Sequence, residues 1–230
     1  MLSVDRAREI YDRIGAWQDT QQFYESAAVN SMVAHGDFGT AQSVFELGCG
    51  TGRIAEQLLA GHLPPTARYH GVDLSSTMVR LASSRLARFG SRATVFLSSG
   101  SVVIAAEARS LDRCVSTYVL DLLPDDAIRQ FFSESRRVLV PGGRLCLTSL
   151  APGQRGVSRV VSTVWSRVQA LAPNLVGGCR PIDLSEYLSS AWSVTCSELV
   201  VAWGVASQVL VATPCDEKLG ANTTFSDPSK

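Results

Sequence analysis

Residues 44 to 52 read Val-Phe-Glu-Leu-Gly-Cys-Gly-Thr-Gly and place a carboxylate, a thiol and three glycines in one short turn. The apolar residues before Glu46 predict a buried strand, and Arg53 to Leu59 predict the helix that follows. Glycine has no Cβ and tolerates positive φ, so such a turn lets the backbone approach a ligand closely. The N-terminus of the following helix adds amide groups that attract an anion. Strand, glycine turn and helix together indicate a site for a nucleotide-type cofactor.

The spacing of the glycines decides between classes of nucleotide. A dinucleotide site has the pattern Gly-x-Gly-x-x-Gly, in which the glycines serve a pyrophosphate. Here Gly48 and Gly50 are followed by Gly52, and Arg53 occupies the place of the third dinucleotide glycine. The Gly-Lys-Ser/Thr end of a P-loop does not follow the turn either. The pattern therefore disfavours both a dinucleotide and a nucleoside triphosphate.

Three further motifs follow the turn in order. Residues 69 to 75 predict a second strand that ends in Asp73, an acidic residue able to accept hydrogen bonds from both ribose hydroxyls. Residues 111 to 120 predict another strand, and residues 137 to 148 read as the end of a helix, a Pro-Gly-Gly turn and a strand. Together the four motifs resemble those of the class I S-adenosylmethionine (SAM) methyltransferases, in particular the small-molecule enzymes of the ubiquinone and menaquinone biosynthesis group. The resemblance covers residues 40 to 150 most closely.

Alternating patterns of strand and helix predict an α/β fold with right-handed crossovers. The resemblance implies a Rossmann-like, doubly wound sheet of seven strands in the order 3-2-1-4-5-7-6, mostly parallel with an antiparallel last strand. The predicted strands span residues 43–47, 68–73, 93–97, 111–117, 143–149, 193–201 and 205–212. The predicted helices span residues 52–60, 75–89, 101–108, 125–139 and 157–171, with a further helix start at 181–188.

The chain divides into three predicted parts. Residues 1–40 are expected to form a helical lid segment, residues 41–213 the SAM-dependent domain, and residues 214–230 a polar tail that frays. Aromatic side chains of the lid segment and of the 157–171 helix are expected to cover the substrate: Tyr11, Phe23, Tyr24 and Trp165.

The resemblance also implies where SAM is held. The glycine turn, with Gly48, Cys49 and Gly50, is expected to pass beneath the ribose and the methionine portion, and Glu46 to receive the methionine ammonium group. Asp73 would bind the ribose. Leu74 and Met78 would form one wall for adenine, with Gly100 and Ser101 near its edge and Thr117 near the methionine end. Many relatives carry Asp where this chain has Ser101, so adenine recognition is expected to differ.

The methyl acceptor is harder to infer, because methyl transfer needs mainly alignment and exclusion of water. A general base is useful where a hydroxyl or phenol reacts. The candidate catalytic residues are Asp121 and Tyr118, which follow the fourth strand, and His35, which precedes the domain. The Asp/Asn-Pro-Pro-Tyr/Phe motif of amino-methylating nucleic-acid enzymes is replaced by Tyr-Val-Leu-Asp at residues 118–121. That difference favours a small-molecule acceptor, and the apolar lid favours a hydrophobic or aromatic one.

Composition supports this interpretation. The chain has 21 basic and 21 acidic residues, which disfavours a nucleic-acid partner. An apolar stretch long enough to span a membrane and a signal peptide are both missing, so a cytoplasmic monomer or homodimer is expected. The six cysteines contain no Cys-x-x-Cys pair, and we predict neither a disulfide framework nor a metal centre.

The sequence therefore predicts an enzyme that binds SAM, releases S-adenosylhomocysteine and methylates a small organic molecule. Three alternatives stay open: a catalyst that uses the sulfonium charge of SAM for a pericyclic or elimination reaction, a dehydrogenase, and a non-catalytic module with a degenerate SAM pocket.

Overall fold

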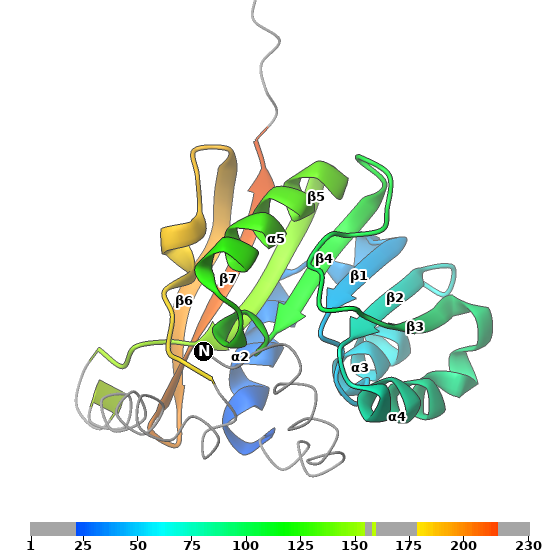
Figure 1. The fold of residues 1–230 in the computed structure, drawn as a ribbon, viewed down its shortest axis with the longest axis horizontal. Coiled ribbons are helices and arrows are strands. Elements are labelled where there is room, and N and C mark those ends of the chain that lie inside the picture. The colour runs from blue at the N-terminus through cyan, green and yellow to red at the C-terminus, as the bar shows by residue number, and fades with distance from the viewer. Residues whose placement is uncertain (1–21, 155–157, 160–178, 216–230) are drawn as a thin grey trace, which may run out of the picture.

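Seven strands form one sheet in the order β3-β2-β1-β4-β5-β7-β6 (Figure 1). The computed structural model describes residues 22–154, 158–159 and 179–215. The strands are β1 (Ser43–Leu47), β2 (Arg68–Asp73), β3 (Ala93–Leu97), β4 (Leu111–Thr117), β5 (Leu139–Leu150), β6 (Trp192–Ala202) and β7 (Val205–Pro214). Strand β7 runs antiparallel to β5 and β6, and the pairs among β1 to β5 are parallel. The predicted strand order and the antiparallel last strand are confirmed.

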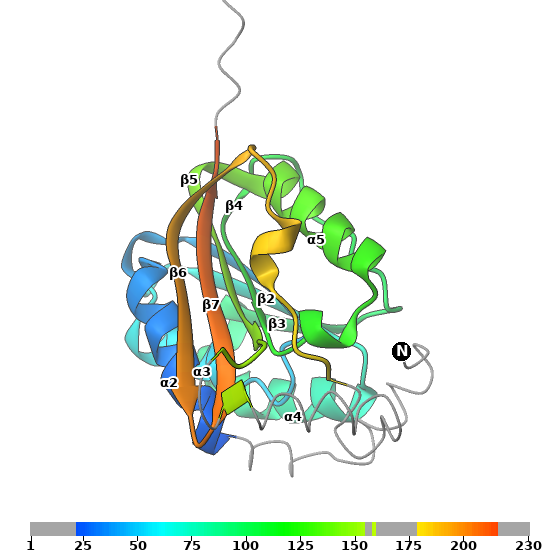
Figure 2. The ribbon, with the colours of Figure 1, turned by 90° about the vertical axis from the view of Figure 1, so that its left-hand side faces the viewer.

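Helices cover both faces of this sheet (Figure 2). They are α2 (Gln22–His35), α3 (Arg53–Gly61), α4 (Ser76–Leu86) and α5 (Asp125–Val138), with short 3-10 helices η2 (Phe38–Thr40), η3 (Ala87–Arg92), η4 (Leu120–Leu122) and η6 (Leu184–Tyr187). One apolar core lies between the sheet and α2, α3 and α4, and the other lies between the sheet, α5 and η6. Among the described residues, no helix is both long enough and apolar enough to cross a membrane.

One predicted helix, at residues 101–108, is wrong: this segment has no regular structure. Val102 and Ile104 are buried in the core beneath α5, and side chains of α5 hold the backbone around them. Glu134 accepts a hydrogen bond from the Ile104 N–H at 3.1 Å, and Arg137 donates to the carbonyl oxygens of Ile104 and Ala106 at 2.8 and 2.9 Å. These tertiary hydrogen bonds replace those a helix would have made.

The structure describes other predicted helices in part. Of the predicted helix at 157–171, only residues 158–159 lie within the described residues, and both are helical. The predicted helix start at 181–188 is the 3-10 helix η6. The segment 1–21, the residues 160–178 and the tail from 216 lie outside the description, so the predicted division into lid, domain and tail stays a prediction.

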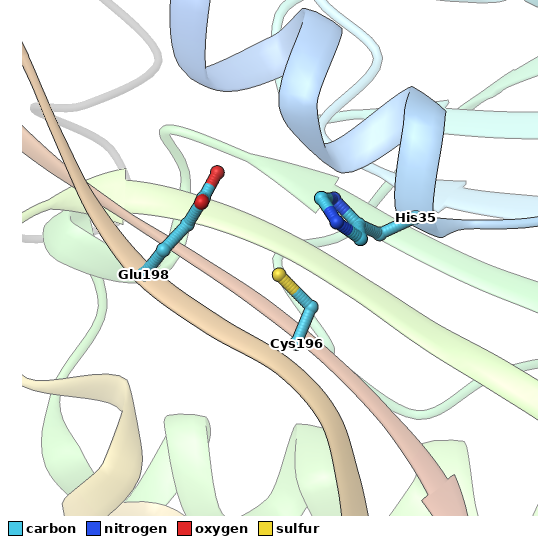
Figure 3. A group of neighbouring side chains, drawn as sticks. All are labelled: His35, Cys196 and Glu198. Carbon is cyan, nitrogen blue, oxygen red and sulfur yellow. The ribbon is translucent and has the colours of Figure 1, made fainter.

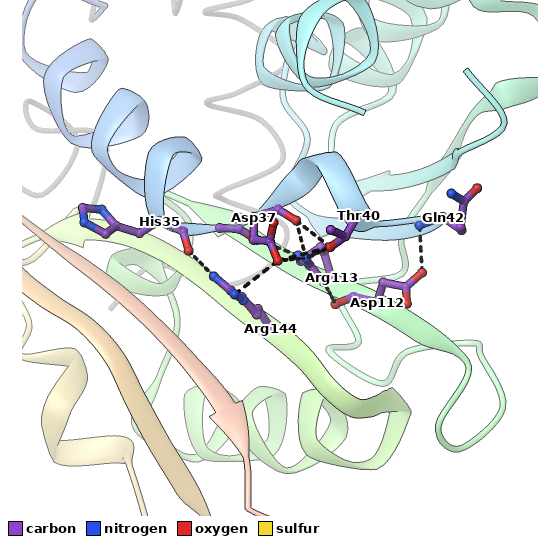
Figure 4. Close-up of polar contacts among 8 residues, drawn as sticks. His35, Asp37, Thr40, Gln42, Asp112, Arg113 and Arg144 are labelled. Carbon is purple, nitrogen blue, oxygen red and sulfur yellow. Dashed lines mark hydrogen bonds and ion pairs between the residues drawn. The ribbon is translucent and has the colours of Figure 1, made fainter. Parts of the chain in front are cut away.

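The guanidinium group of Arg113 in β4 connects α2 to the sheet (Figure 4). The Arg113 side chain is 4% exposed, and its nitrogens donate to the carbonyl oxygens of Gly36, at 2.6 Å, and of Asp37. It also donates to Thr40 Oγ1 at 3.0 Å and to the Asp112 carbonyl at 2.8 Å. A buried charge is tolerated when it is fully hydrogen-bonded, so the turn after α2 is held in a fixed position against β4.

We predict that Arg113→Ala destabilises the protein by about 3 kcal/mol, because the buried Gly36 carbonyl and the neighbouring Asp37 and Asp112 carbonyl groups lose the donor of Arg113. Urea unfolding should show this as a lower midpoint. The matched control is Arg80→Ala, since Arg80 is exposed on α4 and alanine favours helix. Equal midpoints for the two variants would contradict the role of Arg113.

Candidate cofactor and acceptor site

The glycine turn joins β1 to α3 at the carboxyl edge of the parallel strands. The N–H groups of Gly48 and Cys49 donate to the Val72 carbonyl at 2.8 and 3.0 Å, which holds the turn against the end of β2. Gly48 has φ +72°, and a Cβ on it would lie 2.2 Å from a methyl carbon of Val119. Glycine is therefore required here, both for its backbone conformation and for the close approach of the segment after β4.

Asp73, at the tip of β2, organises this turn. Its carboxylate accepts hydrogen bonds from the Gly50 N–H at 2.8 Å and from the Ser75 N–H at 2.9 Å. The N-cap of α4 is Ser75, whose hydroxyl accepts from the Met78 N–H, so Asp73 does not serve as the cap. A carboxylate has about four acceptor positions, and ribose hydroxyls are donors of the kind that it takes.

Glu46 is buried at the end of β1, with 1% of its surface exposed. The Tyr69 hydroxyl donates to Glu46 Oε2 at 2.5 Å, and Glu46 Oε1 has no hydrogen-bond partner among the described residues. Burial raises the pKa of Glu46 to about 7, and the hydrogen bond from Tyr69 opposes this shift. A buried acceptor without a donor fits a ligand ammonium group. The role of Tyr69 could not be predicted from the sequence, because its side chain reaches Glu46 only when β1 pairs with β2.

The loop after β3 lies next to Asp73, because the Ser98 N–H donates to the Asp73 carbonyl at 2.7 Å. Gly100 and Ser101 are exposed in this loop. The Ser101 hydroxyl accepts from the Val103 N–H at 3.1 Å, so it stabilises its own loop. The sequence predicts two further adenine contacts. Leu74, just before α4, is half-buried, and Met78 in α4 is buried, with 1% of its surface exposed. Their contact with adenine stays a prediction.

Tyr118 begins the segment that follows β4, next to the buried Thr117. It has φ +54°, a backbone conformation that costs energy in a residue with a Cβ and that clusters at functional sites. Its hydroxyl donates to Ser207 Oγ at 2.8 Å, and its ring meets that of Tyr24 edge-on, with 6.0 Å between ring centroids. The structure thus brings together two residues that the sequence predicted separately, one for catalysis and one for the lid.

Asp121 lies in η4 beside these tyrosines and is 0% exposed. Neither oxygen of its carboxylate makes a hydrogen bond with any described residue. Burial is the main cause that raises the pKa of Asp121 to about 7; the backbone amides of Leu150 and of Asp121 itself oppose the shift, and the charge of Glu25 adds to it. The Asp121 side chain is close enough to Tyr24 to raise the pKa of that phenol, although burial is the main cause there. A buried, unpartnered carboxylate is costly, which marks Asp121 as a functional candidate.

A partly buried ion pair joins α3 to α2 in this region. Arg53, the first residue of α3, donates to Glu25 of α2 at 3.1 Å, and Glu25 is 8% exposed. Arg180 contacts the segment after β4 at two points. Its backbone N–H donates to the Asp121 carbonyl at 3.0 Å, and its guanidinium group pairs with Asp125 at 2.5 Å. The sequence did not single out Glu25 and Arg180, because isolated charges outside a motif carry no local signal.

The other predicted residues lie elsewhere. Phe23 is 59% exposed and meets Tyr24 and Trp203 edge-on. His35 is at the opposite end of α2, where its carbonyl oxygen accepts a hydrogen bond from Arg144 near the beginning of the parallel part of β5. The structure does not bring His35 to Asp121 and Tyr118, and we do not retain it as a candidate base. Tyr11 and Trp165 lie outside the described residues.

A separate groove with a volume of about 430 Å³ lies beside the loop after β5. Its lining is largely polar and comes from that loop, η6, β6 and β7: Ala151, Pro152, Gly153, Gln154, Asp183, Ser185, Ser197, Glu198, Leu199 and Gln208. The predicted site residues do not contribute to this lining, so the groove is distinct from the region around the glycine turn.

Comparison with known proteins matches residues 44–143 to a methyltransferase domain model. Over these residues the chain is similar to a methyltransferase domain. The malonyl-(acyl-carrier protein) O-methyltransferase of Hahella chejuensis is 27% identical over 208 residues, which cover 84% of this chain and 72% of that protein. The demethylmenaquinone methyltransferase of Lactococcus lactis is 28% identical over 160 residues, which cover 66% of this chain and 61% of that protein.

Solved structures share the fold at lower identity. The geranyl diphosphate C-methyltransferase of Streptomyces coelicolor, in complex with S-adenosylhomocysteine, aligns with a TM-score of 0.62 at 15% identity, over 83% of this chain and 78% of that one. The 4+2 cyclase SpnF aligns with the same TM-score at 16% identity, over 83% and 81% of the two chains. SAM is the cofactor of the methyltransferase domain, and the open acceptor of Glu46 and the close-packed glycine turn fit it.

We predict that Gly48→Ala lowers the affinity for S-adenosylhomocysteine at least tenfold, because the added methyl group must displace Val119 and the backbone has positive φ. Calorimetric titration measures this directly. Gly61→Ala is the matched control, since a Cβ at the end of α3 would meet no atom within 4 Å. Unchanged affinity in Gly48→Ala would show that the turn does not hold the cofactor.

We also predict that Asp121→Asn stabilises the protein at alkaline pH. The pKa of Asp121 is about 7 when folded and about 4 when unfolded, so the native state binds the extra proton between these values. Its contribution to stability is fully present below pH 4 and is lost as pH rises through 7. The variant should therefore gain about 4 kcal/mol over the wild type at pH 8 and less at pH 5. Urea unfolding at both pH values checks this, and an equal effect at both would contradict the raised pKa.

Proposed function

We propose that the protein methylates a small hydrophobic or aromatic molecule, with Asp121 accepting the proton of the reacting group. The observation that carries the proposal is the Asp121 carboxylate, which is fully buried, lacks a hydrogen-bond partner among the described residues and lies beside Tyr24 and Tyr118. A carboxyl group whose pKa lies near 7 is suited to take a proton at neutral pH. A phenol or hydroxyl acceptor needs such help.

The cofactor would be held by the residues around the glycine turn. SAM supplies an activated methyl group on a positively charged sulfur. Glu46 would take the ammonium group with its open oxygen, and Asp73 would accept from the ribose hydroxyls while it keeps the Gly50 N–H in place. Val119 packs against Gly48, so the segment that carries Tyr118 and Asp121 lies directly beside this turn. The acceptor would meet the methyl group there.

The aromatic rings support an apolar acceptor. Tyr24 and Tyr118 meet edge-on, and Phe23 extends this aromatic group along α2 toward Trp203. The Tyr118 hydroxyl donates a hydrogen bond to Ser207. Burial raises the pKa of Tyr24 and of Tyr118, so both side chains stay neutral. Neutral rings bury a flat apolar ligand well. We propose that the lid segment of residues 1–40 and the 157–171 segment complete the cover.

A catalyst of a pericyclic reaction stays a second candidate. The cyclase SpnF has the same fold at 16% identity, so the fold itself does not require methyl transfer. Product analysis separates the two, because methyl transfer releases S-adenosylhomocysteine and a cyclisation leaves SAM intact. A dehydrogenase would instead bind NADH, and a degenerate module would bind SAM without turnover.

The acceptor class, the localisation and the oligomeric state are proposed from the sequence. The even balance of charge favours a free small molecule over a nucleic acid as acceptor. A cytoplasmic monomer or homodimer is our expectation from the sequence.

The test begins with calorimetric titration of SAM, S-adenosylhomocysteine and NADH, followed by an acceptor panel that includes phenols, quinols, carboxylates and amines. We expect SAM-dependent release of S-adenosylhomocysteine with an aromatic hydroxyl compound. Asp121→Asn should lower kcat at least a hundredfold, which is the usual effect of losing a general base, and remove the limb of the pH profile near 7.

The control is Asp126→Asn, because Asp126 is exposed at the start of α5. An Asp121→Asn variant that binds SAM and keeps its kcat and pH profile would refute the role of Asp121. Wild-type protein that binds SAM but consumes none with any acceptor would favour the cyclase or the degenerate module.

A further inference from the structure

The structure brings a histidine, a cysteine and a glutamate together where α2 ends against β6 (Figure 3). One ring nitrogen of His35, Sγ of Cys196 and one carboxylate oxygen of Glu198 all lie within 4.8 Å of one another. We propose that these three residues form a binding site for a single Zn²⁺ ion, which links α2 to the edge strand β6. The site is separate from the glycine turn and from Asp121.

The ligand chemistry fits zinc. Imidazole nitrogen, thiolate sulfur and carboxylate oxygen are its three common protein ligands, with bonds of about 2.0 to 2.3 Å, and a water molecule completes a tetrahedron. Such bonds set neighbouring ligand atoms roughly 3.5 Å apart. Because His35 and Glu198 are exposed and Cys196 is half-buried, small side-chain rotations can close the remaining gap.

Local structure orients each ligand. The register of β6 with β7 shifts between Val194 and Cys196, and such an irregularity re-aims the side chains that follow it. Cys196 and Glu198 are two residues apart on one strand, so they share a face. Figure 3 shows both side chains directed toward the helix that carries His35.

Ser31 of α2 supplies the outer contacts that metal ligands usually have. Nδ1 of His35 lies 2.9 Å from the Ser31 carbonyl oxygen, which places the ring proton on Nδ1 and leaves the lone pair on Nε2. The Ser31 hydroxyl donates to Glu198 Oε1, and this contact holds the Glu198 carboxylate beside α2. The nearby Arg144 is paired with Asp37 at 3.2 Å, which offsets its charge near a cation.

The consequence would be a fixed α2. The same helix carries Tyr24 and Glu25 at its other end, so zinc would hold the acceptor side of the domain from a distance. The Cys-x-Glu pair and His35 are far apart in sequence, which is why the cysteine spacing predicted no metal centre.

We expect the full chain, stripped with a chelator, to bind one equivalent of Zn²⁺ with a Kd in the micromolar range or below and to unfold at a higher temperature with zinc present. Cys196→Ser and His35→Gln should each weaken zinc binding at least tenfold and abolish the thermal shift. Co²⁺ in place of zinc should give a sulfur-to-cobalt charge-transfer band that Cys196→Ser removes.

Cys215→Ser and His62→Gln are the matched controls, since Cys215 is half-buried, His62 is exposed and neither belongs to the cluster. They should bind as the wild type does. Failure to bind Zn²⁺, or binding that both Cys196→Ser and His35→Gln retain, would overturn the proposal. Affinity for S-adenosylhomocysteine should survive in Cys196→Ser, so this test is independent of the proposed methyl transfer.

Discussion

The arrangement of this protein depends on one buried charge, the guanidinium group of Arg113. It is buried between β4 and the turn after α2, where an unpaired charge would be costly, and the carbonyl groups that satisfy it belong to Gly36 and Asp37. The hydrogen bonds therefore determine where the helix ends relative to β4. A helix of 14 residues is about 21 Å long, so fixing one end also directs the other.

The two ends of α2 consequently serve different parts of the molecule. Near its beginning, Tyr24 packs against Tyr118 and Glu25 pairs with Arg53, next to the glycine turn. At its last residue, His35 meets Cys196 and Glu198 on the edge strand. One rigid element thus connects the acceptor region with the proposed zinc site, and an ion at one end would restrict motion at the other.

The region around the turn also carries groups that oppose folding. Burial raises the pKa of Glu46 and of Asp121 to about 7, and among the described residues one oxygen of Glu46 and both of Asp121 have no hydrogen-bond partner. Tyr118 adds a backbone conformation with positive φ. Such features persist where the surrounding structure enforces them. They lower the folding stability of the protein, and they are common at sites that bind a charged ligand. The rest of the sheet, with its two apolar cores, supplies the stability that makes this possible.

The sequence by itself determined the strands, the glycine turn and Asp73, because these follow from local patterns: apolar runs, glycines in a tight turn, and an acidic residue at a strand tip. It failed at residues 101–108, where Glu134 and Arg137 of α5 take the backbone hydrogen bonds that a helix would have used. Only the tertiary structure decided that Tyr69 meets Glu46, that Tyr24 meets Tyr118, and that His35 lies with Cys196 and Glu198 far from Asp121. Those contacts join residues distant in the chain, and no local pattern encodes them.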